Sequence, residues 1–269
     1  MLRFRYNGGV DFSVIVPIFL GLIASGLVNY LADVLPQTLR LSQPTCSNAD
    51  CQAALGWTDY LLLRRCRKCG RGRGLRAFAV LILCVALALY TWFAPPLKLG
   101  FYPGIVVLTY LLLVALIDLE HRLILRPLSI AGLVLAAAAG IFARGWLSTL
   151  VGGGAGFLML FALYQFGRLF ARWRAKRLGK TDDEEALGSG DVTLATILGL
   201  LLGWPLIWYG LLLGILFSGV TSLIIILVLL IARRYKTQMF NVFIPYGIFF
   251  ILGAFMLIYA PLWMSEFVK

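Results

Sequence analysis

Long apolar runs separated by short polar segments make up most of the chain. Each run is about 17 to 24 residues long, enough to cross roughly 30 Å of hydrocarbon as a helix. None has the alternation of apolar and polar residues that is typical of a membrane barrel, and a helix satisfies its own backbone hydrogen bonds in lipid. The pattern predicts eight spanning helices, at residues 13–35, 77–95, 101–119, 127–144, 147–168, 191–207, 208–231 and 243–263.

Composition supports the same fold class. Hydrophobic residues form 61% of the chain, charged residues 13%, and the mean hydropathy is +0.91, far above the values typical of a soluble globular domain. We therefore expect an all-α, polytopic membrane protein in a lipid bilayer. The first apolar run is full length and no small-residue cleavage site follows it, so we expect it to remain as the first span.

Most cations fall on one side of the predicted bundle. Arg3, Arg5, Lys98, Arg144 and Lys269 lie on the other side. The remaining 19 Lys and Arg residues lie in four loops, 36–76, 119–126, 168–190 and 232–242. The positive-inside rule makes those loops cytoplasmic and both termini external. The net charge of +12 then serves mainly to orient the protein in the membrane, and attraction to anionic lipid is a secondary effect. We expect no nucleic acid partner.

The first cytoplasmic loop contains two pairs of cysteines, Cys46 with Cys51 and Cys66 with Cys69. Four thiolates around tetrahedral Zn²⁺ suit a short segment that cannot bury a core of its own, and the flanking arginines stabilise an anionic metal site. Two disulfides or unconnected thiols are the alternatives, and the reducing cytoplasm disfavours disulfides. The first pair has four intervening residues instead of the usual two. Cys84, inside the second span, is expected only to pack against its neighbours.

Two carboxylates stand at span boundaries on the same side of the membrane. Asp118 ends the third span, and Asp191 begins the sixth directly after Gly188, Ser189 and Gly190. Either acid alone could be an interfacial group that reaches water, but ionisable groups at lipid-embedded helices are costly and are functional candidates. Two close aspartates that share one proton can act as base and acid in peptide hydrolysis. Gly188 and Gly190 would let an extended substrate strand approach the backbone.

The ends of the predicted helices suggest different roles for the two acids. Asp191 lies near a helix amino terminus, where the helix dipole favours negative charge, and Asp118 lies near a carboxyl terminus, where it does not. We therefore expect Asp191 to be the ionised base and Asp118 the protonated acid, within a pair whose titration belongs to both groups.

In this order and spacing, the motifs resemble those of type IV prepilin leader peptidases. The similar elements are "GLIASGLVNYLADVLP" in the first span, the four-cysteine loop, "ALIDLEHRLI", the Gly-Ser-Gly-Asp tetrapeptide and "IPYGIFFILGAF" in the last span. The resemblance covers nearly the whole chain. It implies an eight-span GxGD aspartyl protease of the bacterial cytoplasmic membrane, without a catalytic metal. Such enzymes remove the basic leader from prepilins and pseudopilins at the cytoplasmic face, typically after a glycine.

The resemblance also implies roles for individual residues. It assigns catalysis to Asp118 and Asp191, and zinc binding to Cys46, Cys51, Cys66 and Cys69. Many members also N-methylate the new amino terminus with S-adenosylmethionine. The chain departs from the family pattern by having Leu125 and Arg126 in place of Pro-Asp or Pro-Asn, Val34 in place of arginine, Thr193 in place of lysine, and no acid near Leu81. These departures leave the proteolytic pair intact and leave methylation open.

The family resemblance suggests three parts. Residues 1–35 form the amino-terminal segment and first span, residues 36–76 the cytoplasmic zinc-binding loop domain, and residues 77–269 a seven-helix peptidase domain. The acidic run at 182–185, which includes Glu184 and Glu185, would attract the basic leader, or else serve only as a solubilising loop.

Three other functions fit parts of the pattern. A proton-coupled transporter also uses membrane aspartates, but near the midplane and often in repeated halves; here they cluster at one face and no internal repeat is evident. A structural scaffold that holds a zinc module would tolerate loss of either aspartate. A zinc enzyme is disfavoured because four cysteine ligands leave no open position for water.

Overall fold

The computed structural model describes residues 14–46, 51, 53–96, 98–178, 188–231 and 246–260, without the side chains of 174–178. The described residues are mostly helical, and their only β-type pairing is a single bridge between Thr45 and Ala54. The chain forms two compact units, residues 1–95 and 96–269. The predicted all-α membrane fold is confirmed.

The first unit contains two long helices and a small loop region. Its helices are α1 (Ile15–Thr38), α2 (Trp57–Leu61) and α3 (Leu75–Phe93). Helices α1 and α3 pack along each other. The buried Asn29 side chain of α1 donates a hydrogen bond of 3.4 Å to the carbonyl of Ala77 on α3. A polar contact of this kind fixes the register between two otherwise apolar helices.

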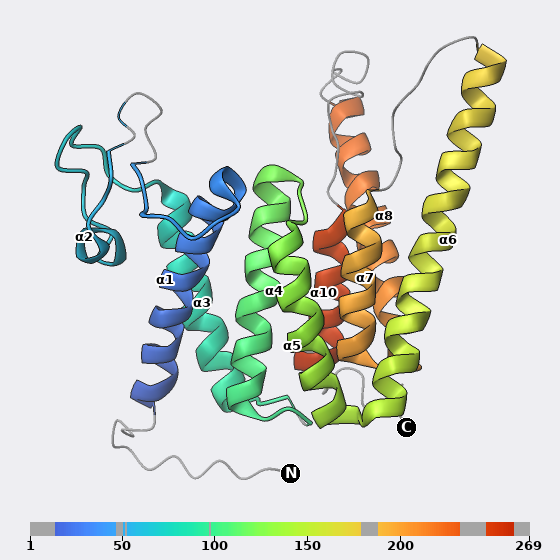
Figure 1. Cartoon of the computed structure of the whole chain (residues 1–269), viewed down its shortest axis with the longest axis horizontal. Helices are drawn as coiled ribbons and strands as arrows, with labels where there is room; N and C mark the ends of the chain where they lie inside the picture. Colours follow the sequence, from blue (N-terminus) through green and yellow to red (C-terminus); the bar gives the residue numbers. More distant parts are fainter. Residues whose placement is uncertain are drawn as a thin grey trace. The chain divides into compact units, whose positions relative to one another are not determined.

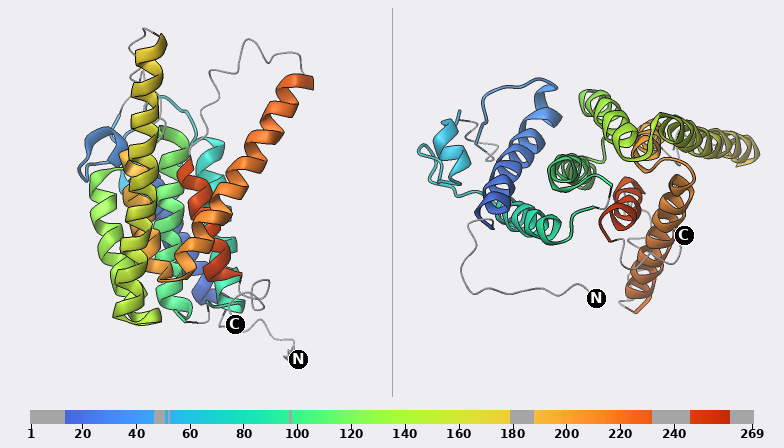
Figure 2. Two further views of the ribbon diagram at one scale, coloured as in Figure 1. Left: turned by 90° about the vertical axis from the view of Figure 1, so that its right-hand side faces the viewer. Right: turned by 90° about the horizontal axis from the view of Figure 1, so that it is seen from below.

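The second unit is a bundle of six described helices (Figure 1). They are α4 (Phe101–His121), α5 (Arg126–Arg144), α6 (Trp146–Leu178), α7 (Ser189–Leu202), α8 (Leu206–Ile231) and α10 (Tyr246–Tyr259). Helix α7 is the most enclosed, because α5, α6, α8 and α10 all contact it. Within this unit, α6 runs beyond its neighbours and α8 leaves the bundle at an angle (Figure 2).

Each of the eight predicted spans contains a described helix. Six of these helices are long and apolar enough to cross a membrane, and α7 and α10 are shorter apolar helices. Helix α7 ends at Leu202 rather than at the predicted residue 207, since Gly203 adopts a positive φ of 69° and Pro205 follows. The Trp204 N–H then bonds to the Ser148 carbonyl of α6 at 3.0 Å. The chain therefore turns from α7 into α8 against the start of α6.

Glycines allow α6 and α7 to approach backbone to backbone. A Cβ at Gly152 would lie 2.5 Å from the Gly199 carbonyl oxygen, and a Cβ at Gly199 would collide with the Gly152 carbonyl oxygen. One turn further along α6, Gly156 meets the Ala195 carbonyl in the same way. Small residues at such spacing are typical of close helix pairs in membranes. They hold α7, and with it Asp191, against the longest helix of the unit.

Candidate active site and metal centre

Asp118 lies in the last turn of α4 and is only 6% exposed. The helix ends three residues later, where Arg122 takes a left-handed conformation with φ of 54° and donates its N–H to the Asp118 carbonyl at 2.9 Å. Within the described part of the chain, Oδ2 of Asp118 has no hydrogen-bond partner. A buried carboxylate oxygen without a partner is costly in a purely structural role and is available to hold a proton or a water molecule.

Asp191 lies in the first turn of α7 and is half-buried. Its Oδ2 accepts a hydrogen bond of 3.3 Å from the backbone N–H of Gly188, the residue before the helix begins. The side chain therefore caps its own helix, at the end where the dipole stabilises negative charge.

The bundle brings the two predicted aspartates to the same end of the second unit. Asp191 is near enough for its charge to act on the Asp118 carboxylate. The first turn of α10 adjoins Asp118, and Ile248 directs its backbone N–H to that carboxylate. Two carboxylates of unlike environment, one buried and one capping a helix, can divide the tasks of acid and base.

The two glycines before Asp191 have different surroundings. Gly188 is exposed, and of the described atoms a Cβ there would approach only Asp191 Oδ2, at 3.7 Å, and the Gly190 nitrogen, at 3.9 Å. A Cβ at Gly190 would lie 2.9 Å from the Cβ of Ile124, in the segment between α4 and α5. Gly190 thus allows α7 to approach the segment that follows Asp118. Gly188 thus has more space beside it than Gly190, where Ile124 is close, and a substrate strand at these glycines stays a prediction.

Sequence reasoning missed two residues that face Asp118. Gly247 and Ile248 belong to the motif "IPYGIFFILGAF", which marked the last span without indicating which helix it meets. Neither Gly247 nor Ile248 has a polar side chain that would have drawn attention to the contact. Glu184 and Glu185, with the rest of the acidic run, lie outside the described residues, so their role in substrate binding stays a prediction.

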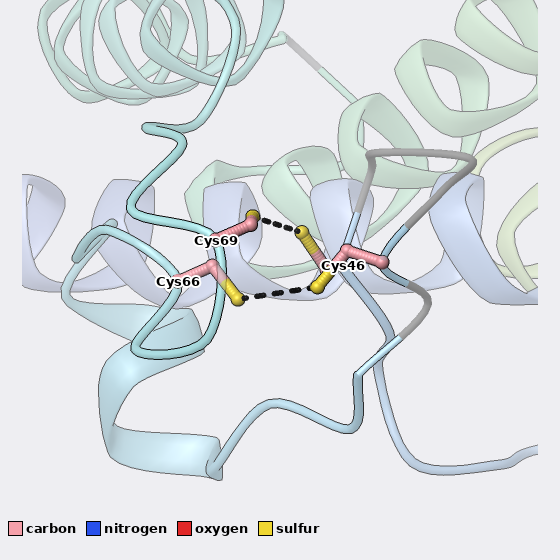
Figure 3. A group of neighbouring side chains, drawn as sticks. Cys46, Cys66 and Cys69 are labelled. Atoms are coloured by element: carbon pink, nitrogen blue, oxygen red, sulfur yellow. Dashed lines mark hydrogen bonds between the residues drawn. The ribbon is translucent and has the colours of Figure 1, made fainter.

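The four loop cysteines form one cluster in the first unit. Their sulfur atoms all lie within 4.8 Å of one another. Figure 3 shows Cys46 and Cys69 pointing toward each other with Cys66 beside them, and the Cys46–Cys69 Sγ distance is 3.6 Å. The sulfurs of Cys51 and Cys66 are 4.0 Å apart. None of the five cysteines, all of which lie in the described residues, forms a disulfide.

Two tight backbone structures position the cysteines. Cys46 follows the Thr45–Ala54 bridge and donates its N–H to the Ala53 carbonyl at 2.9 Å. Cys66 begins a turn closed by a bond of 2.8 Å from the Gly70 N–H to its carbonyl, with Gly70 at φ of 70°. The backbone N–H groups of Cys69 and then Lys68 lower the pKa of the Cys66 thiol to about 7. The turn therefore favours the thiolate that a metal requires.

The cluster fits a tetrahedral zinc ion. Zinc–sulfur bonds of about 2.3 Å place tetrahedral sulfurs roughly 3.8 Å apart, and the observed distances of 3.6 and 4.0 Å bracket that value. Arg64, Arg71 and Arg73 line a cavity of about 180 Å³ beside Cys46 and Cys66, so positive charge adjoins the thiolates. Four cysteines complete the coordination, which suits a structural site.

A second polar cluster in the first unit surrounds Asp33, near the end of α1. Its carboxylate pairs with Arg73 at 2.5 Å and with Arg76 at 2.7 Å. It also accepts a hydrogen bond from the Tyr60 hydroxyl, and the Arg73 guanidinium stacks 3.6 Å over the Tyr60 ring. Burial raises the pKa of Tyr60 well above its usual range, so the hydroxyl remains a donor. Sequence reasoning missed this cluster because Asp33 is 27 to 43 residues from the three groups that face it.

Comparisons with known proteins identify related sequences. Residues 105–227 match the type IV leader peptidase family. A protein of Myxococcus xanthus (strain DK1622), the "Prepilin leader peptidase/N-methyltransferase", is 30% identical over 202 residues. That alignment covers 69% of this chain and 55% of the relative, so the chain spans about half the length of the curated relative. No solved structure matches. The matched segment 105–227 contains both Asp118 and Asp191.

Proposed function

We propose that this chain is a membrane aspartyl endopeptidase, because its residues 105–227 match the type IV leader peptidase family. Its substrates are type IV prepilins or pseudopilins, from which it removes the basic leader at the cytoplasmic face. One observation carries the proposal: α4 and α7 bring two carboxylates to one end of the bundle, and one of them, Asp118, keeps a buried oxygen without a partner in the described residues.

The proposed reaction is hydrolysis by general acid–base catalysis. The ionised aspartate takes a proton from water as the water oxygen bonds to the scissile carbonyl carbon, and the protonated aspartate gives its proton to the carbonyl oxygen. A tetrahedral diol results. The C–N bond then breaks: one aspartate protonates the leaving nitrogen while the other takes the proton of a diol hydroxyl, which becomes the C=O of the carboxyl product, and the products are a carboxylic acid and an amine. The pair ends with one proton, as it began, and is ready for a second turnover.

The surroundings of each carboxylate support an assignment of roles. Asp191 accepts the Gly188 N–H at 3.3 Å at the start of α7, which suits the ionised base. Asp118 is the more buried of the two and suits the protonated acid. The sequence predicted that only the carboxyl end of α4, which disfavours negative charge, would act on Asp118. The carboxylate also lies beside the amino end of α10, which favours negative charge.

The cysteine cluster has a separate, structural role in this proposal. Zinc bound there would replace the hydrophobic core that the short loop lacks. Cys46, Cys51, Cys66 and Cys69 would supply all four ligands and leave this zinc no open position for water.

N-methylation of the new amino terminus is a second candidate activity. The Myxococcus relative is named as a methyltransferase as well as a peptidase, and S-adenosylmethionine would be the methyl donor. The residues at 34, 81 and 193 depart from the family pattern, whereas both aspartates are kept. Methylation is therefore tested separately from cleavage.

Substrate and location complete the proposal. The enzyme resides in the bacterial cytoplasmic membrane with both termini outside, and the substrate keeps an apolar helix in the bilayer while its basic leader reaches the aspartates. The acidic run at 182–185 attracts that leader. Neutralising all four acids should then lower cleavage at low ionic strength and have less effect at high salt; equal cleavage at low salt would make the run a solubilising loop.

The decisive experiment is cleavage of a candidate prepilin from the same organism by the purified protein in lipid nanodiscs, followed by mass spectrometry. Loss of the leader mass establishes cleavage. A further gain of one methyl group, only when S-adenosylmethionine is present, establishes methylation. We expect Asp118→Asn and Asp191→Asn each to reduce the rate of cleavage by at least about 10³-fold, because the two aspartates act together and either change removes one of them.

Glu120→Gln provides the matched control, since Glu120 is an exposed acid two residues from Asp118. It should cleave at the wild-type rate. Full activity of either aspartate variant would exclude the dyad, and an intact prepilin after prolonged incubation with folded wild-type enzyme would exclude this substrate class.

A further inference from the structure

The first turn of α10 is built around the Asp118 carboxylate. A Cβ added at Gly247 would lie 2.5 Å from Asp118 Oδ2 and 3.3 Å from its Cγ. The next residue, Ile248, directs its backbone N–H to the same carboxylate. Gly247 is itself buried. The backbone of α10 therefore covers one side of the carboxylate, at the position where a side chain would otherwise be.

Gly247 matters for its lack of a side chain and not for an unusual backbone conformation. Its backbone is helical, so alanine could adopt the same conformation and would ordinarily favour a helix more than glycine does. The nearest atom to the added methyl is the end of the Asp118 side chain, which can rotate; the next residue met is Leu194, at 3.2 Å. A methyl group here would consequently turn the carboxylate away from its present direction more readily than it would separate the helices.

We infer that Gly247 is a positioning residue: by lacking a side chain, it lets the amino-terminal turn of α10 hold the Asp118 carboxylate in the orientation that meets Asp191. Helix α4 carries the acid, α7 carries its partner and α10 orients the acid. The inference rests on the proposed function, because the orientation matters only if Asp118 takes part in the reaction. It adds a third helix to a site that would otherwise consist of two.

The kinetic test compares Gly247→Ala with Gly219→Ala. Gly219, on α8, is exposed, and no atom of the described residues lies within 4 Å of an added Cβ. We expect Gly247→Ala to lower kcat at least about tenfold with KM within about twofold, since a small misplacement of a catalytic group slows the chemical step. Gly219→Ala should retain both constants. A Gly247→Ala enzyme with wild-type kcat would overturn the inference.

A stability test separates the contact from catalysis. Unfolding temperatures are measured for wild type, Gly247→Ala, Asp118→Ala and the double variant, in the same detergent. We expect the change in unfolding temperature caused by Gly247→Ala to be more negative in the wild-type protein than in Asp118→Ala, where the facing carboxylate is absent. An equal shift of the unfolding temperature in both backgrounds would show that the Gly247–Asp118 contact does not decide the effect of the alanine. If wild type cleaves no prepilin but the cycle shows coupling, the proposed function fails while the contact stands.

Discussion

Asp33 shows how one carboxylate secures several parts of the first unit. It faces two guanidinium groups and a phenol that come from different segments of the chain. The side chain of Arg73 is only 8% exposed, so its charge depends on Asp33 for compensation. An uncompensated buried charge is strongly destabilising. The pair thus joins α1 to the segment that begins α3.

We expect Asp33→Asn to lower the free energy of unfolding by about 2 to 4 kcal/mol, because it leaves the Arg73 charge unpaired. Thermal or denaturant unfolding of the purified protein would measure the change. Asp59→Asn is the matched control: its ion-pair partners Arg64 and Arg67 are 61% and 81% exposed, so the expected loss of ion pairing is under about 1 kcal/mol. Equal losses for the two variants would contradict this account.

At the scale of elements, the position of α7 depends on its backbone contact with α6. Gly152 and Gly199 face each other across this contact. We expect Gly152→Val to destabilise the protein by about 1 to 3 kcal/mol through overpacking, and to reduce prepilin cleavage because α7 carries Asp191.

Gly154→Val is the matched control for that prediction. Gly154 lies two residues along the same helix and is exposed, and among the residues that the structure describes nothing lies within 4 Å of an added Cβ. Its effect on the unfolding free energy should stay within about 0.5 kcal/mol. If the two variants lower the free energy of unfolding equally, the cause is the loss of a glycine from α6 and not the contact between α6 and α7.

The cysteine loop is the second element whose stability can be tested. We expect the purified protein to contain one zinc ion per chain, measured by elemental mass spectrometry. Cys66→Ser should release it, because three remaining thiolates bind zinc far more weakly than four. Cys84→Ser, in α3 and apart from the cluster, should retain the metal. Full zinc content in the Cys66→Ser protein would contradict a four-cysteine site.

At the scale of the whole molecule, the distribution of cations predicts the orientation in the membrane. Alkaline phosphatase, which is active only outside the cytoplasm, should be active when fused after Gly145 and inactive when fused after Arg122. A fluorescent protein that folds only in the cytoplasm should give the opposite result. The reverse pattern at both positions would show that the 19 cations of the four loops face outward.

Much of this architecture was predictable because membrane helices depend on length and hydrophobicity, which are local properties. The cysteines and the two aspartates were recognisable because their chemistry is rare in such a sequence. The end of α7 at Leu202 was not, since it depends on the conformation of Gly203 and its contacts with α6. Gly247 and the Asp33 cluster were not either, because tertiary contacts decide which distant segments meet.

The shortness of α7 also bears on how water and substrate arrive. Its 14 residues rise only about 21 Å, against roughly 30 Å of hydrocarbon. A helix of that length cannot reach both headgroup levels unless the bilayer thins around it. In the proposed reaction, a first turn that stops short of the headgroups would place Asp191 in a depression of the membrane surface, and a leader would have to bend down into it while the rest of its chain stays anchored in lipid.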